Sequence, residues 1–145
     1  YSRGKIERKI NLSNNISFIP VICYEIVFYW KLLNKLNNKS NFIVNITNDF
    51  WFGDYLGPYQ HFYLTKIRAA EFNKPIIRVS NNGISAVIDN NGAVLNKTAF
   101  NKAENLKHKL FLKENNNFVN FHLIFKIYLF ITFILTTFYY LRKND

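Results

Sequence analysis

An apolar segment near the end of the chain, residues 118–141, constrains the fold more than any other stretch. It reads FVNFHLIFKIYLFITFILTTFYYL, and Lys126 is the only charged residue in it. As a helix, 24 residues would span about 36 Å, which exceeds the ~30 Å hydrocarbon core of a bilayer. We therefore predict a transmembrane helix over residues 118–141.

The flanks of this segment are also typical of a membrane span. Tyr139 and Tyr140 stand where interfacial aromatic residues are found, and a short basic tail, residues 142–145, follows them. A buried or surface-lying helix is the alternative, because the stretch without any charge, residues 127–141, is short. Counting basic residues on the two sides would place the preceding domain in the cytoplasm. Large folded domains escape that rule, so the count leaves the orientation open.

The preceding residues, 1–115, alternate between strand and helix patterns and are expected to form one domain. Short β-branched runs predict strands and longer runs with helical spacing predict helices. Two Asn-Asn-Gly turns indicate an antiparallel region, whereas the strand-helix-strand order indicates parallel strands, so an α/β fold with a mixed sheet is expected. Pro20 favours an edge or bulge position for the strand that contains it. Strands are predicted at 16–23, 41–47, 74–80, 84–89, 93–95 and 106–112, and helices at 25–39 and 59–73.

The composition narrows the possible functions. The net charge is +10, but the lysines are scattered and form no basic arm, so we predict a solvated surface and no nucleic-acid partner. One cysteine and three widely spaced histidines form no recognisable ligand set, so we expect no metal or other cofactor.

Cys23 follows a predicted buried strand and precedes a predicted helix. A helix start favours an anion and offers free backbone N–H groups, so this position suits a thiolate nucleophile. A small apolar residue packed in the core is the alternative, and the residues alone leave both open. The nearby loop, residues 48–58, contains Phe50, Trp51, Phe52 and Tyr55, which is unusual for a loop and indicates that it covers something.

The pattern as a whole resembles a known family. The pieces ICYEIVF, NITNDFWFGDYLGPYQH and NNG occur in the order and spacing of apolipoprotein N-acyltransferases, bacterial membrane enzymes of the nitrilase superfamily. The likeness runs over nearly the whole chain. Thr47, Phe50 and Tyr59 depart mildly from the usual residues of these motifs.

The resemblance implies part of a nitrilase-like αββα sandwich followed by one C-terminal transmembrane helix. It implies transfer of an acyl chain from a phospholipid to the N-terminal amine of a diacylglyceryl lipoprotein, through a cysteine thioester. The expected location is the bacterial inner membrane, with the domain facing the periplasm. The implied catalytic residues are Cys23, as nucleophile, and Glu25, and the implied substrate-binding residues are Tyr24, Asn48 and Trp51.

One departure is larger. The superfamily also uses a glutamate base and a lysine far upstream of the cysteine, and Lys5 and Glu7 are too close to Cys23 to match them. We therefore expect the C-terminal part of such an enzyme, inactive alone, with one sheet face uncovered. A membrane-tethered amidase of the nitrilase group, or a non-catalytic membrane-anchored module, are the alternatives.

Overall fold

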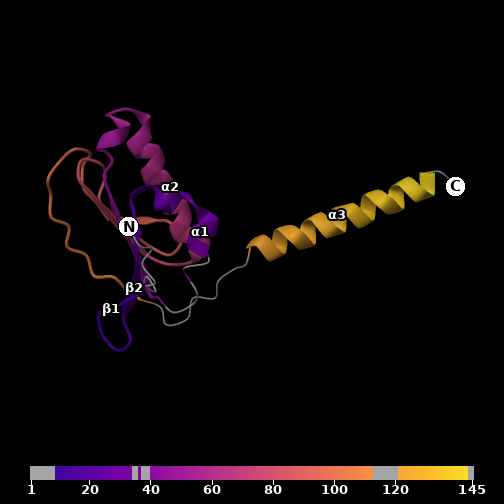
Figure 1. The fold of residues 1–145 in the computed structure, drawn as a ribbon, viewed down its shortest axis with the longest axis horizontal. Coiled ribbons are helices and arrows are strands. Elements are labelled where there is room, and N and C mark those ends of the chain that lie inside the picture. The colour runs from indigo at the N-terminus through magenta and orange to yellow at the C-terminus, as the bar shows by residue number, and fades with distance from the viewer. Residues whose placement is uncertain (1–8, 34–35, 37–39, 113–120, 144–145) are drawn as a thin grey trace, which may run out of the picture.

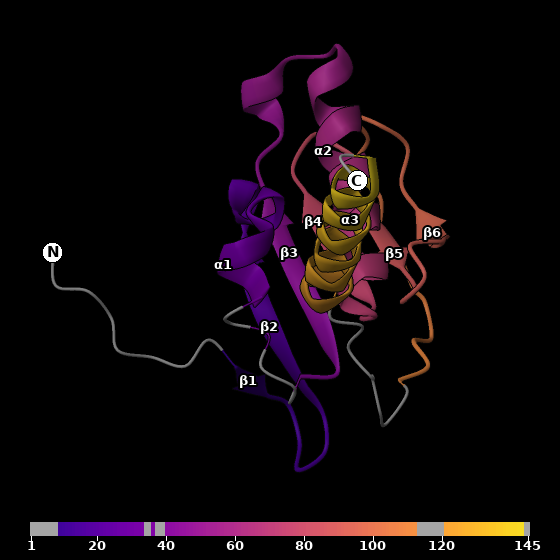
Figure 2. The ribbon, with the colours of Figure 1, turned by 90° about the vertical axis from the view of Figure 1, so that its right-hand side faces the viewer.

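The structure is a computed structural model that describes residues 9–33, 36, 40–112 and 121–143. Within these ranges a single mixed sheet has the strand order β1-β2-β3-β4-β5-β6 (Figure 2). Its central strands β2, β3 and β4 are parallel, and the other neighbours pair antiparallel. The predicted mixed sheet is therefore confirmed. The strands are β1 (Ile10–Asn11), β2 (Ser17–Ile22), β3 (Phe42–Thr47), β4 (Ile76–Ser80), β5 (Ala86–Ile88) and β6 (Val94–Lys97).

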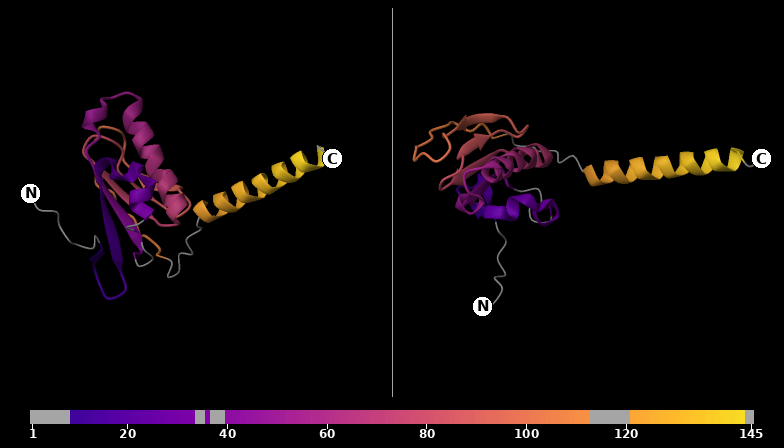
Figure 3. Two further views of the ribbon diagram at one scale, coloured as in Figure 1. Left: turned by 45° about the vertical axis from the view of Figure 1, so that its right-hand side comes forward. Right: turned by 90° about the horizontal axis from the view of Figure 1, so that it is seen from above.

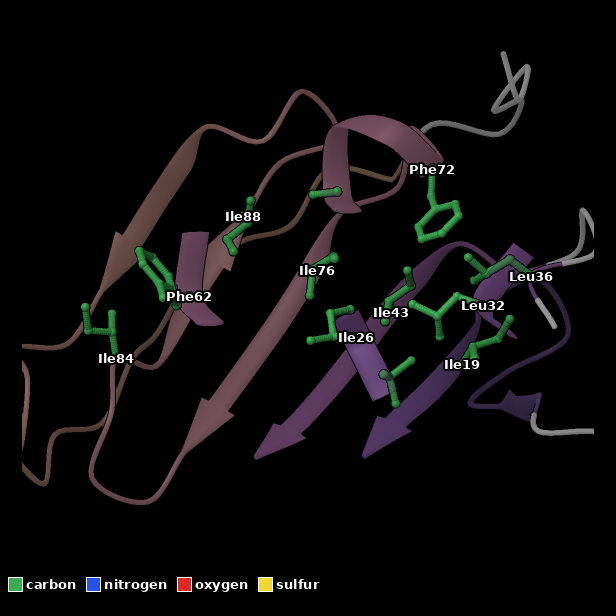
Figure 4. Packing of buried hydrophobic residues seen from close by; sticks show 13 residues of the cluster. Ile19, Ile26, Leu32, Leu36, Ile43, Phe62, Phe72, Ile76, Ile84 and Ile88 are labelled. Carbon is green, nitrogen blue, oxygen red and sulfur yellow. The ribbon is translucent and has the colours of Figure 1, made fainter. Parts of the chain in front are cut away.

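Helices α1 and α2 cover one face of this sheet (Figures 1 and 2). Successive strand residues point to opposite faces, so every second residue of the parallel strands faces the helices. The core between the two layers is formed by residues such as Ile43, Ile76 and Phe72, which are fully buried (Figure 4). The helical elements are the 3-10 helices η1 (Cys23–Val27) and η2 (Phe50–Phe52) and the α-helices α1 (Tyr29–Leu33), α2 (Leu56–Phe72) and α3 (Phe121–Lys143).

The other face of the sheet carries an apolar row at its carboxyl end. Ile22, Ile46 and Val79 are neighbours in register across β2, β3 and β4. Their exposed fractions are 52%, 51% and 49%, although Ile and Val are usually buried. One half of a sandwich is expected to present such a row.

The predicted helix over residues 25–39 is wrong as a continuous element. The structure has η1 and then α1, with a break at Phe28, and residues 34, 35 and 37–39 lie outside the described ranges. The break has a physical cause, because Arg68 of α2 takes two of the carbonyl groups that a continuous helix would use. Its Nε donates to Ile26 O at 3.0 Å and its Nη2 donates to Val27 O at 2.8 Å.

The strand predicted over residues 106–112 is also wrong, because these residues are irregular. Leu106, Leu110 and Leu112 are only half-buried, and no described strand pairs with this segment. The second predicted helix begins at Leu56, earlier than the predicted residue 59. β1 pairs with β2 only at Ser17 and Phe18, so at Pro20 the one described strand beside β2 is β3, and β2 is locally an edge there, as predicted.

The C-terminal helix α3 has 23 residues and projects away from the domain (Figures 1 and 3). Its segment Leu123–Lys143 is long and apolar enough to cross a membrane, and none of it is buried in the structure. Residues 118–120 of the predicted span lie outside the described ranges, and α3 continues through Arg142 to Lys143. By length and composition, α3 is thus a candidate membrane span.

Candidate active site

Cys23 lies at the carboxyl end of the sheet, where β2 ends and η1 begins. Its φ of +47° is in the left-handed region, which costs a residue with a Cβ roughly 1–2 kcal/mol. The buried side chain of Asn45, on the neighbouring strand β3, holds this turn. Its Nδ2 donates to Val21 O at 3.1 Å and to Cys23 O at 3.4 Å.

Glu25 also supports the turn. Its Oε2 accepts a hydrogen bond from the backbone N–H of Ile22 at 3.0 Å, which caps the start of η1. The carboxylate therefore lies beneath the turn that presents Cys23. This geometry suits a residue that positions the Cys23 turn, and no contact between the Glu25 carboxylate and the sulfur is seen among the described hydrogen bonds.

The sulfur of Cys23 meets the end of β3 and the loop that follows. Thr47 Oγ1 is 3.5 Å from Sγ, and Sγ is 3.9 Å from the backbone oxygen of Asn48. Cys23 is half-buried, so the sulfur is not enclosed in the core. Partial burial raises the pKa of the thiol. Hydrogen bonds with the backbone of Asn48, the Thr47 hydroxyl and the backbone of Tyr24 lower the pKa, and because they outweigh burial, it lies below its ordinary value.

Asn48 organises the loop beside Cys23. Its Oδ1 accepts hydrogen bonds from the backbone N–H of Phe50 at 3.1 Å and from Asn81 Nδ2 at 2.7 Å. Asn81 Oδ1 in turn accepts from the backbone N–H of Asp49 at 3.1 Å. The loop after β3 and the first Asn-Asn-Gly turn are thereby held together.

Asp49 is held by several side chains of the site, and it was not among the residues predicted from the sequence. Its Oδ1 is 2.8 Å from His61 Nδ1, and its Oδ2 accepts from Arg78 at 2.5 Å and from Ser80 Oγ at 2.9 Å. Burial raises the pKa of Asp49, but the bonds from His61, Arg78 and Ser80 outweigh it and lower the pKa to about 2. Asp49 is therefore an anion at neutral pH.

Arg78 connects the turn that carries Cys23 with the loop that carries Asp49. It is fully buried, and besides Asp49 its Nη1 donates to Asn45 Oδ1 at 2.9 Å and to Thr65 Oγ1 at 3.0 Å. Asn45 carries the Cys23 turn, and Asp49 lies in the loop on the other side of the sulfur. One buried guanidinium thus fixes both.

The aromatic loop lies next to Cys23. Trp51, in η2, is 83% exposed, and Phe50 beside it is also exposed. Tyr24 follows Cys23, and its ring packs on Phe52 at 6.1 Å and on His61 at 5.7 Å between centroids. The predicted site residues Cys23, Tyr24, Asn48 and Trp51 therefore lie on two adjacent loops at one end of the sheet, and Glu25 supports one of them.

A separate hollow of ≈ 620 Å³ lies where η1 and α1 face α2 and the start of α3. Arg68 and Glu71 form an ion pair in its wall, and the remaining lining is aromatic or aliphatic. Within the described ranges, no group of three His, Cys, Asp or Glu side chains is arranged to hold a metal ion. The lining residues are Val27, Phe28, Tyr29, Trp30, Arg68, Glu71 and Phe125.

The mixed sheet, with parallel central strands and helices on one face, has the arrangement of part of a nitrilase-like domain. The chain belongs to the carbon-nitrogen hydrolase family, which matches residues 11–110. Among solved structures, Nit3 of Saccharomyces cerevisiae, a member of the nitrilase superfamily, has a TM-score of 0.55 and 18% sequence identity. The similarity covers 70% of this chain and 40% of that one, and it concerns the fold alone.

Several similar curated proteins are apolipoprotein N-acyltransferases, which confirms the resemblance. The protein of that name from Allorhizobium ampelinum is 41% identical over 111 residues, covering 77% of this chain and 21% of the relative. The one from Rickettsia bellii is 44% identical over 88 residues, covering 61% of this chain and 17% of the relative. The chain thus spans about a fifth of the length of these relatives.

Proposed function

We propose that this chain supplies the nucleophile of an acyltransferase that moves a fatty acyl chain from a phospholipid to the N-terminal amine of a diacylglyceryl lipoprotein. The observation that carries the proposal is the position of Cys23. Its sulfur is half-buried, hydrogen-bonded and next to a loop with exposed aromatic side chains. The similarity to apolipoprotein N-acyltransferases supports the choice of donor and acceptor.

In the proposed reaction, the Cys23 thiolate attacks the carbonyl carbon of the phospholipid ester. A C–S bond forms, and the ester C–O bond breaks to release a lysophospholipid. The lipoprotein amine then attacks the thioester, an amide bond forms, and the electron pair of the C–S bond returns to sulfur. The lowered pKa of the thiol favours the first step because more of the sulfur is ionised at neutral pH.

The other predicted residues take supporting roles. Glu25 holds the turn through Ile22 N–H, and Asn48 holds the loop through its side-chain bonds. Tyr24 and Trp51 present aromatic surface beside the sulfur, where acyl chains would lie. The base that receives protons and the lysine that stabilises the oxyanion are proposed to come from other parts of a longer protein.

The membrane location follows from the same proposal. The apolar helix α3 would cross a bacterial inner membrane, and the domain would face the periplasm with its aromatic loop at the lipid surface. Exposed Phe and Trp side chains are stable at such an interface, whereas they are unfavourable in water.

A segment exchange tests this function. Residues 11–110 of this chain replace the matching part of the A. ampelinum apolipoprotein N-acyltransferase, and purified membranes are supplied with phospholipid and a diacylated lipopeptide. We expect N-acylated lipopeptide from this chimera and none from its Cys23→Ser variant, with equal amounts of both proteins in the membrane.

Two other outcomes would contradict the proposal. Release of ammonia from simple amides without acyl transfer would favour a membrane-tethered amidase, which the carbon-nitrogen hydrolase match makes the second candidate. Equal activity of the chimera and its Cys23→Ser variant would indicate a non-catalytic module in which Cys23 only packs.

A further inference from the structure

The Thr47 hydroxyl, at the end of β3, lies between two possible acceptors. Its Oγ1 is 3.5 Å from Cys23 Sγ and 3.3 Å from Asp49 Oδ1. A hydroxyl group has one hydrogen to donate, so it can serve only one of these acceptors at a time. Thr47 is only 6% exposed, and water therefore competes little for this hydrogen.

Asp49 does not depend on Thr47 for its hydrogen bonds. His61 Nδ1 lies 2.8 Å from Oδ1, and Arg78 and Ser80 both donate to Oδ2. The carboxylate therefore remains well solvated by the protein when the Thr47 hydrogen turns away. Sulfur has fewer partners, so the direction of that hydrogen depends mainly on the charge of Cys23.

We propose that Thr47 is a further catalytic residue, whose hydroxyl donates to Cys23 Sγ when the sulfur is a thiolate and turns to Asp49 when the sulfur is covalently bound. On ionisation the S–H bond breaks, the proton leaves to solvent or a base, and the electron pair stays on Sγ. A thiolate accepts hydrogen bonds strongly, whereas a thioester sulfur accepts them poorly. The inference rests on the proposed function only in taking Cys23 as the nucleophile.

Other groups also act on the sulfur, and a test must keep them constant. The positive charge of Arg78 favours the thiolate and the negative charge of Asp49 opposes it. Glu25 lies on η1 itself, and His61 acts from α2 through Asp49. A Thr47→Val change keeps the volume of the side chain and all of these charges, and it removes only the hydroxyl.

The test is the pH dependence of Cys23 alkylation by iodoacetamide in the full 145-residue chain in detergent. The chain has one cysteine, so the modified thiol is unambiguous. We expect Thr47→Val to raise the midpoint of the rate profile by about one pH unit, because a hydrogen bond to a charged acceptor is lost. Thr47→Ser, which keeps the hydroxyl, should retain the wild-type midpoint.

Ser80→Ala is the matched control. It also removes a hydroxyl that donates to Asp49, but that hydroxyl makes no hydrogen bond with Cys23 among those described. Its midpoint should stay close to that of the wild type. An unchanged midpoint in Thr47→Val, or an equal shift in Ser80→Ala, would overturn the proposal. If circular dichroism shows that Thr47→Val is unfolded, the Thr47→Ala variant replaces it. The pH midpoint of thiolate formation is then measured from the ultraviolet absorbance of the thiolate, and an unchanged midpoint would again overturn the proposal. Alkylation needs no acyl substrate, so its outcome is independent of the chimera assay.

Discussion

Arg78 donates to Asp49 across 2.5 Å, and both side chains are fully buried. Through Asn45 the same guanidinium also reaches the turn that carries Cys23. A buried ion pair of this kind adds little net stability compared with an apolar pair, but it leaves an uncompensated charge when one partner is removed.

Replacing Arg78 by methionine should destabilise the domain by about 3–5 kcal/mol, because it leaves the Asp49 carboxylate buried without its cation. Urea denaturation of the full chain in detergent, followed by circular dichroism, measures the change. Lys97→Met is the control, since Lys97 is exposed on β6 and should shift stability by no more than about 0.5 kcal/mol. Similar losses in the two variants would mean that Arg78 has no organising role.

Stability should fall in acid because of Asp49. Its pKa is lowered in the folded state to about 2, so the carboxylate stabilises the fold fully above its unfolded pKa near ~4. That contribution, about 2 kcal/mol, is lost as the pH falls from about 4 towards 2. We expect Asp49→Asn to be less stable than the wild type at pH 6 and to approach it near pH 2. A stability difference that stays constant over this range would contradict the assignment.

Gly83 should not tolerate a side chain. A Cβ there would lie 2.0 Å from Asp49 Oδ2 and 2.6 Å from Ser80 Oγ, so Gly83→Ala must displace the buried carboxylate. We expect a loss of about 3 kcal/mol in the same urea assay. Gly53→Ala is the matched control, because a Cβ there meets nothing within 4 Å and only its φ of +64° is unfavourable, at a cost near 1 kcal/mol. Equal costs at both positions would argue against the close packing of Gly83.

The aromatic loop should touch lipid. The chain has two tryptophans, so Trp30→Phe leaves Trp51 as the only indole and Trp51→Phe leaves Trp30 of α1. In the Trp30→Phe protein we expect strong fluorescence quenching of Trp51, which is 83% exposed, by vesicles of brominated phospholipid compared with vesicles of the same lipid without bromine. Trp30 is not a control for distance from the membrane, because it lines the hollow beside Phe125 of α3. Weak quenching of Trp51 would show that the aromatic loop does not contact lipid.

Local patterns predicted the parts of the fold that depend on neighbouring residues. Alternation and turn residues located β2 to β6, but they missed the two-residue strand β1 and predicted a strand at 106–112 that is irregular. The loop with the aromatic residues lies beside the sulfur of Cys23 in the structure. The break at Phe28 could not be predicted, because it depends on Arg68, which lies 42 residues beyond the Ile26 carbonyl that it binds.

The buried network was missed for a related reason. Sequence motifs pointed to Cys23, Tyr24, Glu25, Asn48 and Trp51, whereas hydrogen bonds between distant strands leave no periodic signal. One signal was nevertheless present. Positions 76, 78 and 80 of a buried strand share the inward face, so an arginine at the middle position requires a buried anion as its partner.

The most direct test of the account is the mass of Cys23 after acyl transfer is interrupted. The chimera is incubated with phospholipid in the absence of lipopeptide, and its cysteine-containing peptide is analysed by mass spectrometry. The account predicts one fatty acyl group on Cys23, removed by neutral hydroxylamine and absent from the Cys23→Ser protein. An unmodified Cys23 in a chimera that still transfers acyl chains would contradict it.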